Sequence, residues 1–152
     1  MRVSAKAEYA VRAAMELAAT NEEGPVKKSA IVAAQQIPPK FLENILGELR
    51  NAGLVESQRG SDGGYWLAKP ASEISVADVM RAVEGPLASV RNQRPETMEY
   101  EGLASPLQQV WVALRASIRD VLEAVTLADL VSGKLPKEVQ AITKPREAWV
   151  SQ

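Results

Sequence analysis

The chain has 152 residues, of which 46% are apolar and 24% charged, so it can bury the core of one small domain with an appended element. Its formal net charge of −1 neither predicts nor excludes a nucleic-acid partner, because charges of both signs can be segregated onto different faces. Cysteine and histidine are both absent, which excludes disulfides, thiolate nucleophiles, histidine bases, Cys/His zinc sites and cysteine-held iron–sulfur clusters.

Signals for a membrane or for export are missing from the sequence. No run approaches the roughly 18 apolar residues that a membrane span needs, and residues 1–6 lead into an amphipathic pattern instead of an apolar signal core. We therefore expect a cytoplasmic protein with no membrane partner. The Ser, Tyr, Lys and carboxylate residues form no recognisable catalytic constellation, and no phosphate-binding glycine loop follows a strand. We therefore expect that the protein is not an enzyme and that it binds neither a metal nor a cofactor.

The first predicted helix covers about residues 4–19. Apolar side chains recur there every three or four positions, and Ser4 is a suitable N-cap because its side-chain oxygen can accept a bond from a free amide. The sequence Asn-Glu-Glu-Gly-Pro at 21–25 predicts a turn after this helix.

Two further helices are predicted close together. One covers about 28–36 with Ile31 and Ala34 facing inward, and Pro38 ends it because proline lacks an N–H and disfavours helical geometry in the preceding residue. The other covers about 39–52, starts with a proline and ends before a glycine. Its predicted buried stripe consists of Phe41, Leu42, Ile45, Leu46 and Leu49. This pair of helices, the second with a polar outer face, is typical of a helix-turn-helix.

The pattern then changes to the alternation of strands at 54–58 and 65–68. The connection between them contains Asp-Gly, which favours a hairpin because glycine supplies the positive φ that tight turns need. The predicted wing turn consists of Gly60, Ser61, Asp62, Gly63 and Gly64. A helix-turn-helix followed directly by a hairpin predicts a winged helix-turn-helix DNA-binding domain in residues 1–84. The predicted fold class is mainly α with a small β-hairpin.

Several segments of the chain resemble one family of bacterial regulators. They are YAVRA at 9–13, IPPKFLENIL at 37–46, LRNAGLV at 49–55, RGSDGGYWLA at 59–68, ISVADV at 74–79, VEG at 83–85 and VTLADL at 125–130. This combination is similar to the IscR/NsrR/CymR-type (Rrf-two) winged-helix regulators, over about residues 1–132. The resemblance implies a dimeric regulator. Because most members of the family are repressors, it also implies repression. Many members sense iron–sulfur status, nitric oxide or cysteine supply.

The sequence departs from this family where the cluster-binding members carry three cysteines. The corresponding loop, at about 92–107, contains Asn92, Met98 and Ala104 but no thiolate and no imidazole. An iron–sulfur cluster needs such soft ligands. The resemblance therefore implies the DNA-binding and dimerising parts of the family for this chain, and not its cluster-based sensing.

The predicted base-reading residues lie on the recognition helix and at the wing. In the first turns of the helix, Lys40 could reach guanine or a phosphate, Glu43 could accept from cytosine N4, and Asn44 could pair with adenine in the major groove. Arg59 at the wing suits a narrow, electronegative minor groove. The alternative is that these side chains are ordinary solvated surface, with a capping role for Glu43.

Other polar residues are predicted to contact phosphates, which fixes the register on DNA without reading its sequence. They are Arg2, Lys6, Lys28, Ser29 and Arg50. For Arg50 an equal alternative is an ion pair at the surface with Glu48 or Glu56.

A long dimerisation helix is predicted in the region 106–132, after a sensor or connector loop at 85–105 and before a tail at 133–152 that is irregular or partly helical. Its apolar residues follow a 4-3-4-3-4 spacing, widened by two neighbours, that is typical of a helix–helix seam. The predicted interface consists of Leu107, Val110, Trp111, Leu114, Ile118, Val121, Leu122 and Val125. We favour dimerisation because two-fold symmetry matches palindromic half-sites. The alternative is a helix that folds back on its own winged helix.

The sequence thus predicts a transcriptional regulator, most simply a repressor, that binds palindromic double-stranded operators as a homodimer without an iron–sulfur cluster. Two alternatives remain open. One is a protein-interaction regulator controlled by docking to a partner enzyme, and the other is a regulator that senses an unknown small ligand. Trp66, Met98, Tyr100 and Trp111 could line a ligand pocket, although aromatic residues at such positions more often belong to the core.

Overall fold

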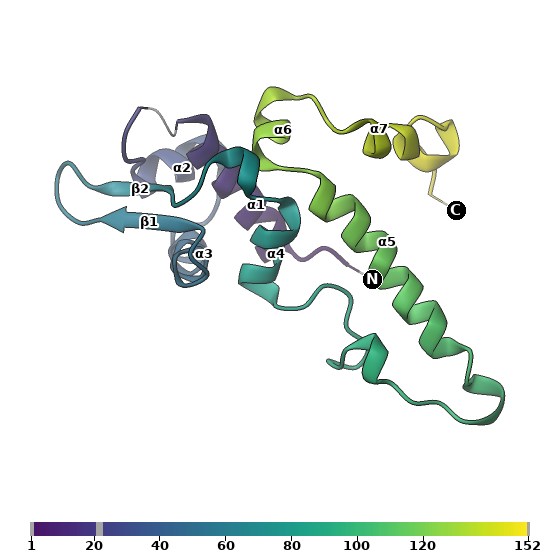
Figure 1. The fold of residues 1–152 in the computed structure, drawn as a ribbon. Helices are drawn as coiled ribbons and strands as arrows, with labels where there is room; N and C mark the ends of the chain where they lie inside the picture. The colour runs from purple at the N-terminus through teal and green to yellow at the C-terminus, as the bar shows by residue number, and fades with distance from the viewer. Residues whose placement is uncertain (1, 21–22, 152) are drawn as a thin grey trace.

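The computed structural model describes residues 2–20 and 23–151. Figure 1 shows a helical body from which a two-stranded hairpin projects at one end and a long helix at the other. The elements are α1 (Ala5–Ala19), α2 (Lys28–Gln35), α3 (Pro39–Asn51), β1 (Val55–Gln58), β2 (Gly64–Leu67), α4 (Val76–Glu84), α5 (Leu107–Ala124), α6 (Leu127–Ser132) and α7 (Lys137–Thr143). The predicted fold class, mainly α with a small hairpin, is confirmed.

The first helix lies where the sequence predicts it. Ser4 caps α1, because its hydroxyl oxygen accepts a hydrogen bond from the Ala7 amide at 3.0 Å. Of the turn predicted at 21–25, residues 21 and 22 lie outside the described residues, and Gly24 adopts the positive φ of 98° that a turn requires.

The turn between α2 and α3 is short, and a backbone hydrogen bond closes its first part. Gln36 adopts a left-handed backbone, and its amide donates to the Val32 carbonyl at 2.8 Å, which ends α2. Ile37 is fully buried beneath the turn, and Pro39 stands at the start of α3, where a missing N–H has no consequence. The predicted helix-turn-helix is therefore present.

Two details of the predicted inward faces are wrong. Ala34 is exposed, because the eight-residue helix α2 buries only Ile31. Phe41 is 41% exposed and lies at the margin of the buried stripe of α3. Its ring packs edge-on against Tyr9 of α1, with centroids 5.6 Å apart and planes at 88°.

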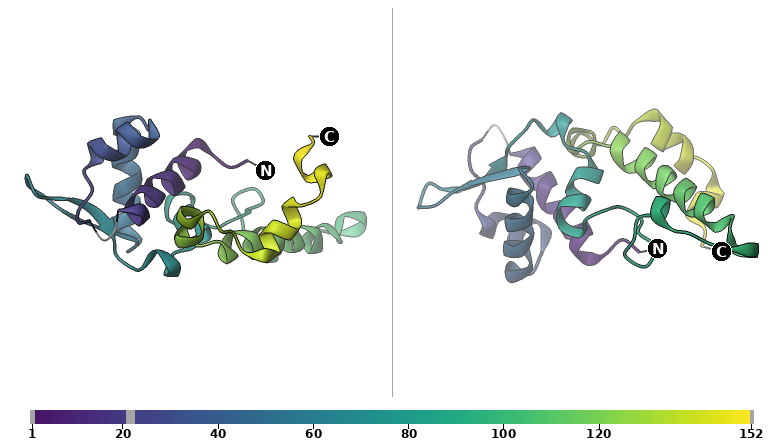
Figure 2. Two further views of the ribbon diagram at one scale, coloured as in Figure 1. Left: turned by 90° about the horizontal axis from the view of Figure 1, so that it is seen from above. Right: turned by 60° about the horizontal axis from the view of Figure 1, so that its bottom comes forward.

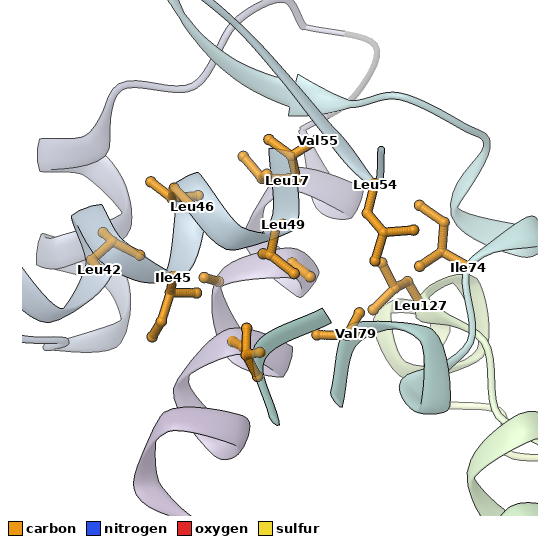
Figure 3. Close-up of a cluster of buried hydrophobic side chains, with 14 of the residues drawn as sticks. Leu17, Leu42, Ile45, Leu46, Leu49, Leu54, Val55, Ile74, Val79 and Leu127 are labelled. Carbon is orange, nitrogen blue, oxygen red and sulfur yellow. The ribbon is translucent and has the colours of Figure 1, made fainter. Parts of the chain in front are cut away.

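The core lies where α1, α3 and α4 meet, as Figure 3 shows. Alanines on α1 allow α3 and α4 to approach its backbone closely, while leucines and isoleucines of α3 fill the space between them. The large side chains that are fully buried here include Leu17, Ile31, Leu42, Ile45, Leu46, Leu49, Ile74, Val79 and Leu127. Burial of one such side chain is worth about 1.5–3 kcal/mol, so this cluster holds the orientation of α3.

The hairpin pairs β1 with β2 in antiparallel register, with Val55 opposite Leu67 and Gln58 opposite Gly64. A second contact secures its base, because Val26 and Tyr65 exchange two backbone hydrogen bonds of 2.8 Å. Val26 therefore acts as a short third strand, which fixes the direction in which the wing projects from the body.

A backbone bridge joins the winged helix to the C-terminal helices. The Val76 amide donates to the Val125 carbonyl and the Leu127 amide donates to the Ile74 carbonyl, both at 2.9 Å. The residues between them, Ser75 and Thr126, each cap the helix that follows and form a complete capping box. Helices α4 and α6 thus start side by side, and α5 must leave the body at this point.

Helix α5 lies against α4, the connector and α7, and its first half projects from the body together with the end of the connector, as Figure 2 shows. None of its side chains, all of which the structure describes, is fully buried. The tail contains α7 and a 3-10 turn, Arg146–Trp149, and its last residue, Gln152, lies outside the described residues. No helix in residues 2–20 or 23–151 is long and apolar enough to cross a membrane.

The wing turn provides a test of this fold. A Cβ added at Gly63 would lie 2.0 Å from the carbonyl oxygen of Gln58, so Gly63→Ala must distort the hairpin. We expect the free energy of unfolding to fall by on the order of 1–3 kcal/mol. The control is Gly47→Ala, where no atom lies within 4 Å of the added Cβ. That change should stabilise α3 by about 0.5–1 kcal/mol. Urea denaturation measures both, and equal effects would contradict the described turn.

Candidate nucleic-acid interface

Helix α3 presents a polar edge to solvent. Leu42, Ile45 and Leu46 are fully buried, so the helical period turns the intervening positions outward. Lys40, Glu43 and Asn44 are accordingly exposed in the first two turns of α3. The three predicted base readers on the helix therefore share one accessible surface.

This edge of α3 stands between two clefts. One cleft, of about 490 Å³, separates α3 from the start of α1 and includes Lys6, Glu43 and Asn44 in its lining. The other, of about 320 Å³, separates α3 from the hairpin and includes Glu43, Arg50 and Arg59. Glu43 lines both clefts, so five of the predicted contact residues, three of them on α3 itself, lie in these two adjoining clefts. This arrangement suits a helix that enters a groove while its flanks receive the phosphate strands.

Two of the predicted phosphate-binding lysines form ion pairs with α3. Lys6 Nζ lies 2.8 Å from Glu48 Oε1, and Lys28 Nζ lies 3.3 Å from Glu43 Oε2. All four side chains keep at least a third of their surface exposed. The pairs link the starts of α1 and α2 to α3 at the surface, and because they are exposed the lysines can exchange a carboxylate for another anion at little cost in free energy.

Arg50 forms an ion pair with neither Glu48 nor Glu56, the two partners considered for it. Its guanidinium donates to the Ser57 hydroxyl on β1 at 3.1 Å. Glu48 accepts from Lys6 instead, and Glu56 accepts from the Trp66 indole at 2.8 Å. Arg50 therefore lies across the cleft between α3 and the hairpin with its charge unneutralised by either carboxylate.

The tip of the wing is held by a residue that the sequence analysis did not single out. Lys27 donates to the carbonyl oxygens of Gly60, at 3.2 Å, and Ser61. Arg59 is exposed beside them, at the end of the wing.

The sequence analysis also missed Ser57 and Gln58, which line the cleft beside the wing. Strand alternation could have identified Gln58 as outward-facing, whereas the contact of Lys27 depends on how the wing folds over α2. Arg2 and Ser29 are exposed.

The predicted dimerisation helix divides into two halves. Near its end, Val125 is buried and Leu122 packs against the core, so this half belongs to the chain's own interior. Near its start, Leu107, Val110 and Leu114 are 39%, 51% and 42% exposed. The fully exposed Leu103 continues their 4-3-4 spacing into the connector, although the sequence analysis did not include it. The remaining predicted seam residues, Trp111, Ile118 and Val121, are half-buried.

The connector does not fit an iron–sulfur cluster. Met98 is 2% exposed, Asn92 carries a hard amide oxygen on an exposed turn, and Ala104 has no ligand atom. Across residues 2–20 and 23–151, no three His, Cys, Asp or Glu side chains are placed to hold a metal ion. Cluster irons are held by soft thiolate or imidazole ligands, and this chain has neither.

The four residues considered for a ligand pocket do not converge. Trp66 lies on the hairpin, where its indole donates to Glu56. Tyr100 and Trp111 meet near the start of α5, where the indole donates to the phenol oxygen at 3.1 Å. Trp66 is therefore excluded from any shared pocket with the other aromatic residues.

The comparisons with known proteins agree with this geometry. A family model named Rrf2, described as an iron-dependent transcriptional regulator, matches residues 3–133. A Mycobacterium tuberculosis protein provisionally named as an HTH-type transcriptional regulator is 54% identical over 151 residues, 99% of this chain and 94% of that protein. The HTH-type transcriptional regulator CymR of Bacillus subtilis is 36% identical over 132 residues, 87% of this chain and 91% of CymR.

Solved structures match over most of the chain. The structure of CymR, titled the global cysteine regulator of B. subtilis, matches with a TM-score of 0.74 at 34% identity and covers 88% of this chain and 98% of that chain. IscR of T. potens matches with a TM-score of 0.70 at 33% identity and covers 100% of this chain and 93% of that chain. Because these matches cover 88% and 100% of this chain, the likeness to the two winged-helix regulators includes the C-terminal helices as well as the wing.

Proposed function

This chain belongs to the Rrf2 family of transcriptional regulators, whose members regulate transcription and are not enzymes, and from that membership we propose that it represses transcription as a homodimer on palindromic operators. The observation that carries the proposal is the exposed polar edge of α3 between two clefts, with a wing at its side. A DNA-binding role follows from the family, and the finer assignments below rest on the geometry.

We assign base reading to the outer edge of α3. In a major groove, Asn44 can donate to and accept from one adenine, and Lys40 can reach guanine or the nearest phosphate. Glu43 can accept from cytosine N4 once Lys28 has exchanged its carboxylate for a phosphate. Arg59, at the wing tip, is placed to enter the adjoining minor groove, where a narrow A/T-rich segment concentrates negative potential.

Phosphate strands fit the clefts on either side of α3. On the wing side, Arg50 and the Ser57 hydroxyl can both donate to a phosphate in the cleft that they share. On the α1 side, Lys6 can turn from Glu48 to a phosphate. Lys28, at the start of α2, can likewise turn from Glu43 to a phosphate. We assign Arg2 and Ser29 to outer phosphates, because both are exposed, Arg2 three residues before α1 and Ser29 in the first turn of α2.

A second copy of the chain is the proposed occupant of the apolar stripe on α5. The stripe runs from Leu103 through Leu107 and Val110 to Leu114, with the heptad-type spacing that packs two helices together. Trp111, Ile118 and Val121 extend it along the helix. Two-fold pairing through α5 would place two wings and two α3 helices on one side of the DNA for the two half-sites.

Substitutions of base-reading residues and of phosphate-binding residues should change DNA binding in different ways. Asn44→Ala should cost on the order of 1–3 kcal/mol and relax the preference at one position per half-site, because it removes a bidentate base contact. Arg59→Ala should lower affinity chiefly for sites with an A/T-rich segment under the wing. Lys28→Ala should weaken all DNA equally and reduce the salt dependence by about one counterion.

Selection of binding sites from random DNA, with each variant and the wild type, measures this difference. An unchanged motif for Asn44→Ala together with an altered motif for Lys28→Ala would reverse the two assignments. If all three variants bind as the wild type does, α3 and the wing do not contact DNA, and control through a partner protein becomes the better proposal.

The stripe on α5 should hold the dimer. Leu114→Asp places a charge in the seam, so we expect dimerisation to weaken by about tenfold or more, with operator affinity falling in parallel. Ile118→Asp should act in the same way. Gln109→Asp, on the opposite side of α5, introduces the same charge and is the matched control. Sedimentation equilibrium and operator titration test this, and a monomeric Leu114→Asp variant with undiminished affinity for a full palindrome would contradict it.

The chain should regulate without an iron–sulfur cluster. We expect the purified protein to be colourless and to bind operator DNA in the presence of a chelator, because no thiolate or imidazole is available to hold iron. Reconstitution with iron and sulfide under anaerobic conditions, followed by absorption spectroscopy, is the measurement. A stable chromophore at a fixed ratio of iron to protein would disprove the expectation.

A further inference from the structure

An arginine-rich cleft lies where α4, the connector and α5 meet. Figure 1 shows these elements on the side of the body away from the wing. It has a volume of about 540 Å³. Its charged lining consists of Arg81, Arg94, Arg115, Arg119, Glu96 and Glu123. Four guanidinium groups thus face two carboxylates in the lining, and Asp78 lies 3.8 Å from Arg81, so the cleft keeps a small excess of positive charge.

The two carboxylates join the three structural parts of the cleft. Arg81 of α4 pairs with Glu123 of α5, which also accepts from Arg119 at 3.3 Å. Arg115 of α5 pairs with Glu96 of the connector. Every bridge between the parts of the cleft therefore runs through an arginine that could bind another anion instead.

The guanidinium of Arg94 takes part in none of these pairs. Within residues 2–20 and 23–151, no carboxylate lies within ion-pair distance of Arg94. Arg119 is half exposed, and its one bond to Glu123 leaves most of its donors free. The planar fork of a guanidinium matches the oxygens of carboxylate and phosphate groups, which makes arginine well suited to bind them.

Both glutamates are held in the charged form. The pKa of Glu96 lies below its ordinary value because its own backbone amide, and then Arg115, donates hydrogen bonds to the carboxylate. The pKa of Glu123 is lowered chiefly by the hydrogen bond from Arg81. The arginines are therefore already arranged to stabilise negative oxygens in this cleft.

We propose that this cleft binds a small dianion through carboxylate or phosphate oxygens, and that the bound anion competes with Glu96 and Glu123 for Arg81, Arg94, Arg115 and Arg119. Such competition would loosen the bridges from α4 and the connector to α5. Because α4 also packs against α1 and α3, a change in its contacts with α5 can alter how two α3 helices are spaced. This second step rests on the proposed function, whereas anion binding itself does not.

Two anions serve as probes for the full chain, inorganic phosphate and succinate, each at pH 8 where both are dianions. We expect each to raise the melting temperature above that in sodium chloride of equal ionic strength, and to give a saturable titration by calorimetry. Arg94→Gln and Arg119→Gln should each weaken the titration by about tenfold or more, because each removes a charge-assisted pair of donors. Arg91→Gln, in the same connector but outside the cleft lining, is the matched control and should bind as the wild type does.

The outcomes separate the site from its consequence. A response to both probes no larger than that to chloride, or equal losses in Arg94→Gln and Arg91→Gln, would overturn the site even if operator binding is intact. Dissociation of the dimer by Arg94→Gln would also overturn it, because the arginine would then pair across the interface. Saturable binding that leaves operator affinity unchanged in the wild type would overturn the coupling to DNA. Supporting results are probe-dependent operator affinity in the wild type and Arg91→Gln, and its loss in Arg94→Gln.

Discussion

The backbone bridge between residues 74–76 and 125–127 is the constraint on which the rest of the structure depends. Its two hydrogen bonds would be weak in water, but Ile74 and Leu127 are fully buried beside them, so neither partner can exchange for solvent without opening the core. The paired capping boxes at Ser75 and Thr126 fix both helix starts at the same level. The direction of α5, and with it the arginine-rich cleft, follows from this junction.

The orientation of α3 has a different source. Apolar packing of α3 on α1 and α4 fixes its position, since a few buried leucines outweigh surface ion pairs worth about 0–1 kcal/mol each. Lys6 and Lys28 are therefore not needed to hold α3 in place. Their ion pairs with Glu48 and Glu43 keep the lysine side chains ordered beside the two clefts while leaving them free to transfer to phosphates. The protein can thus present cations beside the outer edge of α3, where we propose DNA binds, without depending on them for stability.

Local patterns in the sequence predicted the helix-turn-helix and the hairpin, because apolar periodicity and turn residues act over a few positions. The exposure of Phe41 was not predicted, since periodicity marks a stripe but not its margin, which Tyr9 on another helix decides. The contact between Arg50 and Ser57 depends on how β1 returns along α3. The arginine-rich cleft could not be predicted at all, because residues of α4, the connector and α5 meet there only through tertiary packing.

Helix α5 illustrates why a heptad spacing alone cannot assign an interface. Its apolar residues form one continuous pattern in the sequence, yet Leu122 and Val125 serve the chain's own fold while Leu107, Val110 and Leu114 are left open. In the proposed dimer, α5 is anchored in its own chain at one end and paired with another copy at the other, so it can transmit displacement between the two. Because α4 packs against α1, α3 and α5, any event that changes the contact between α4 and α5 acts on a helix that also holds α1 and α3. A shift at that contact can therefore reach the proposed DNA-binding edge of α3 through α4.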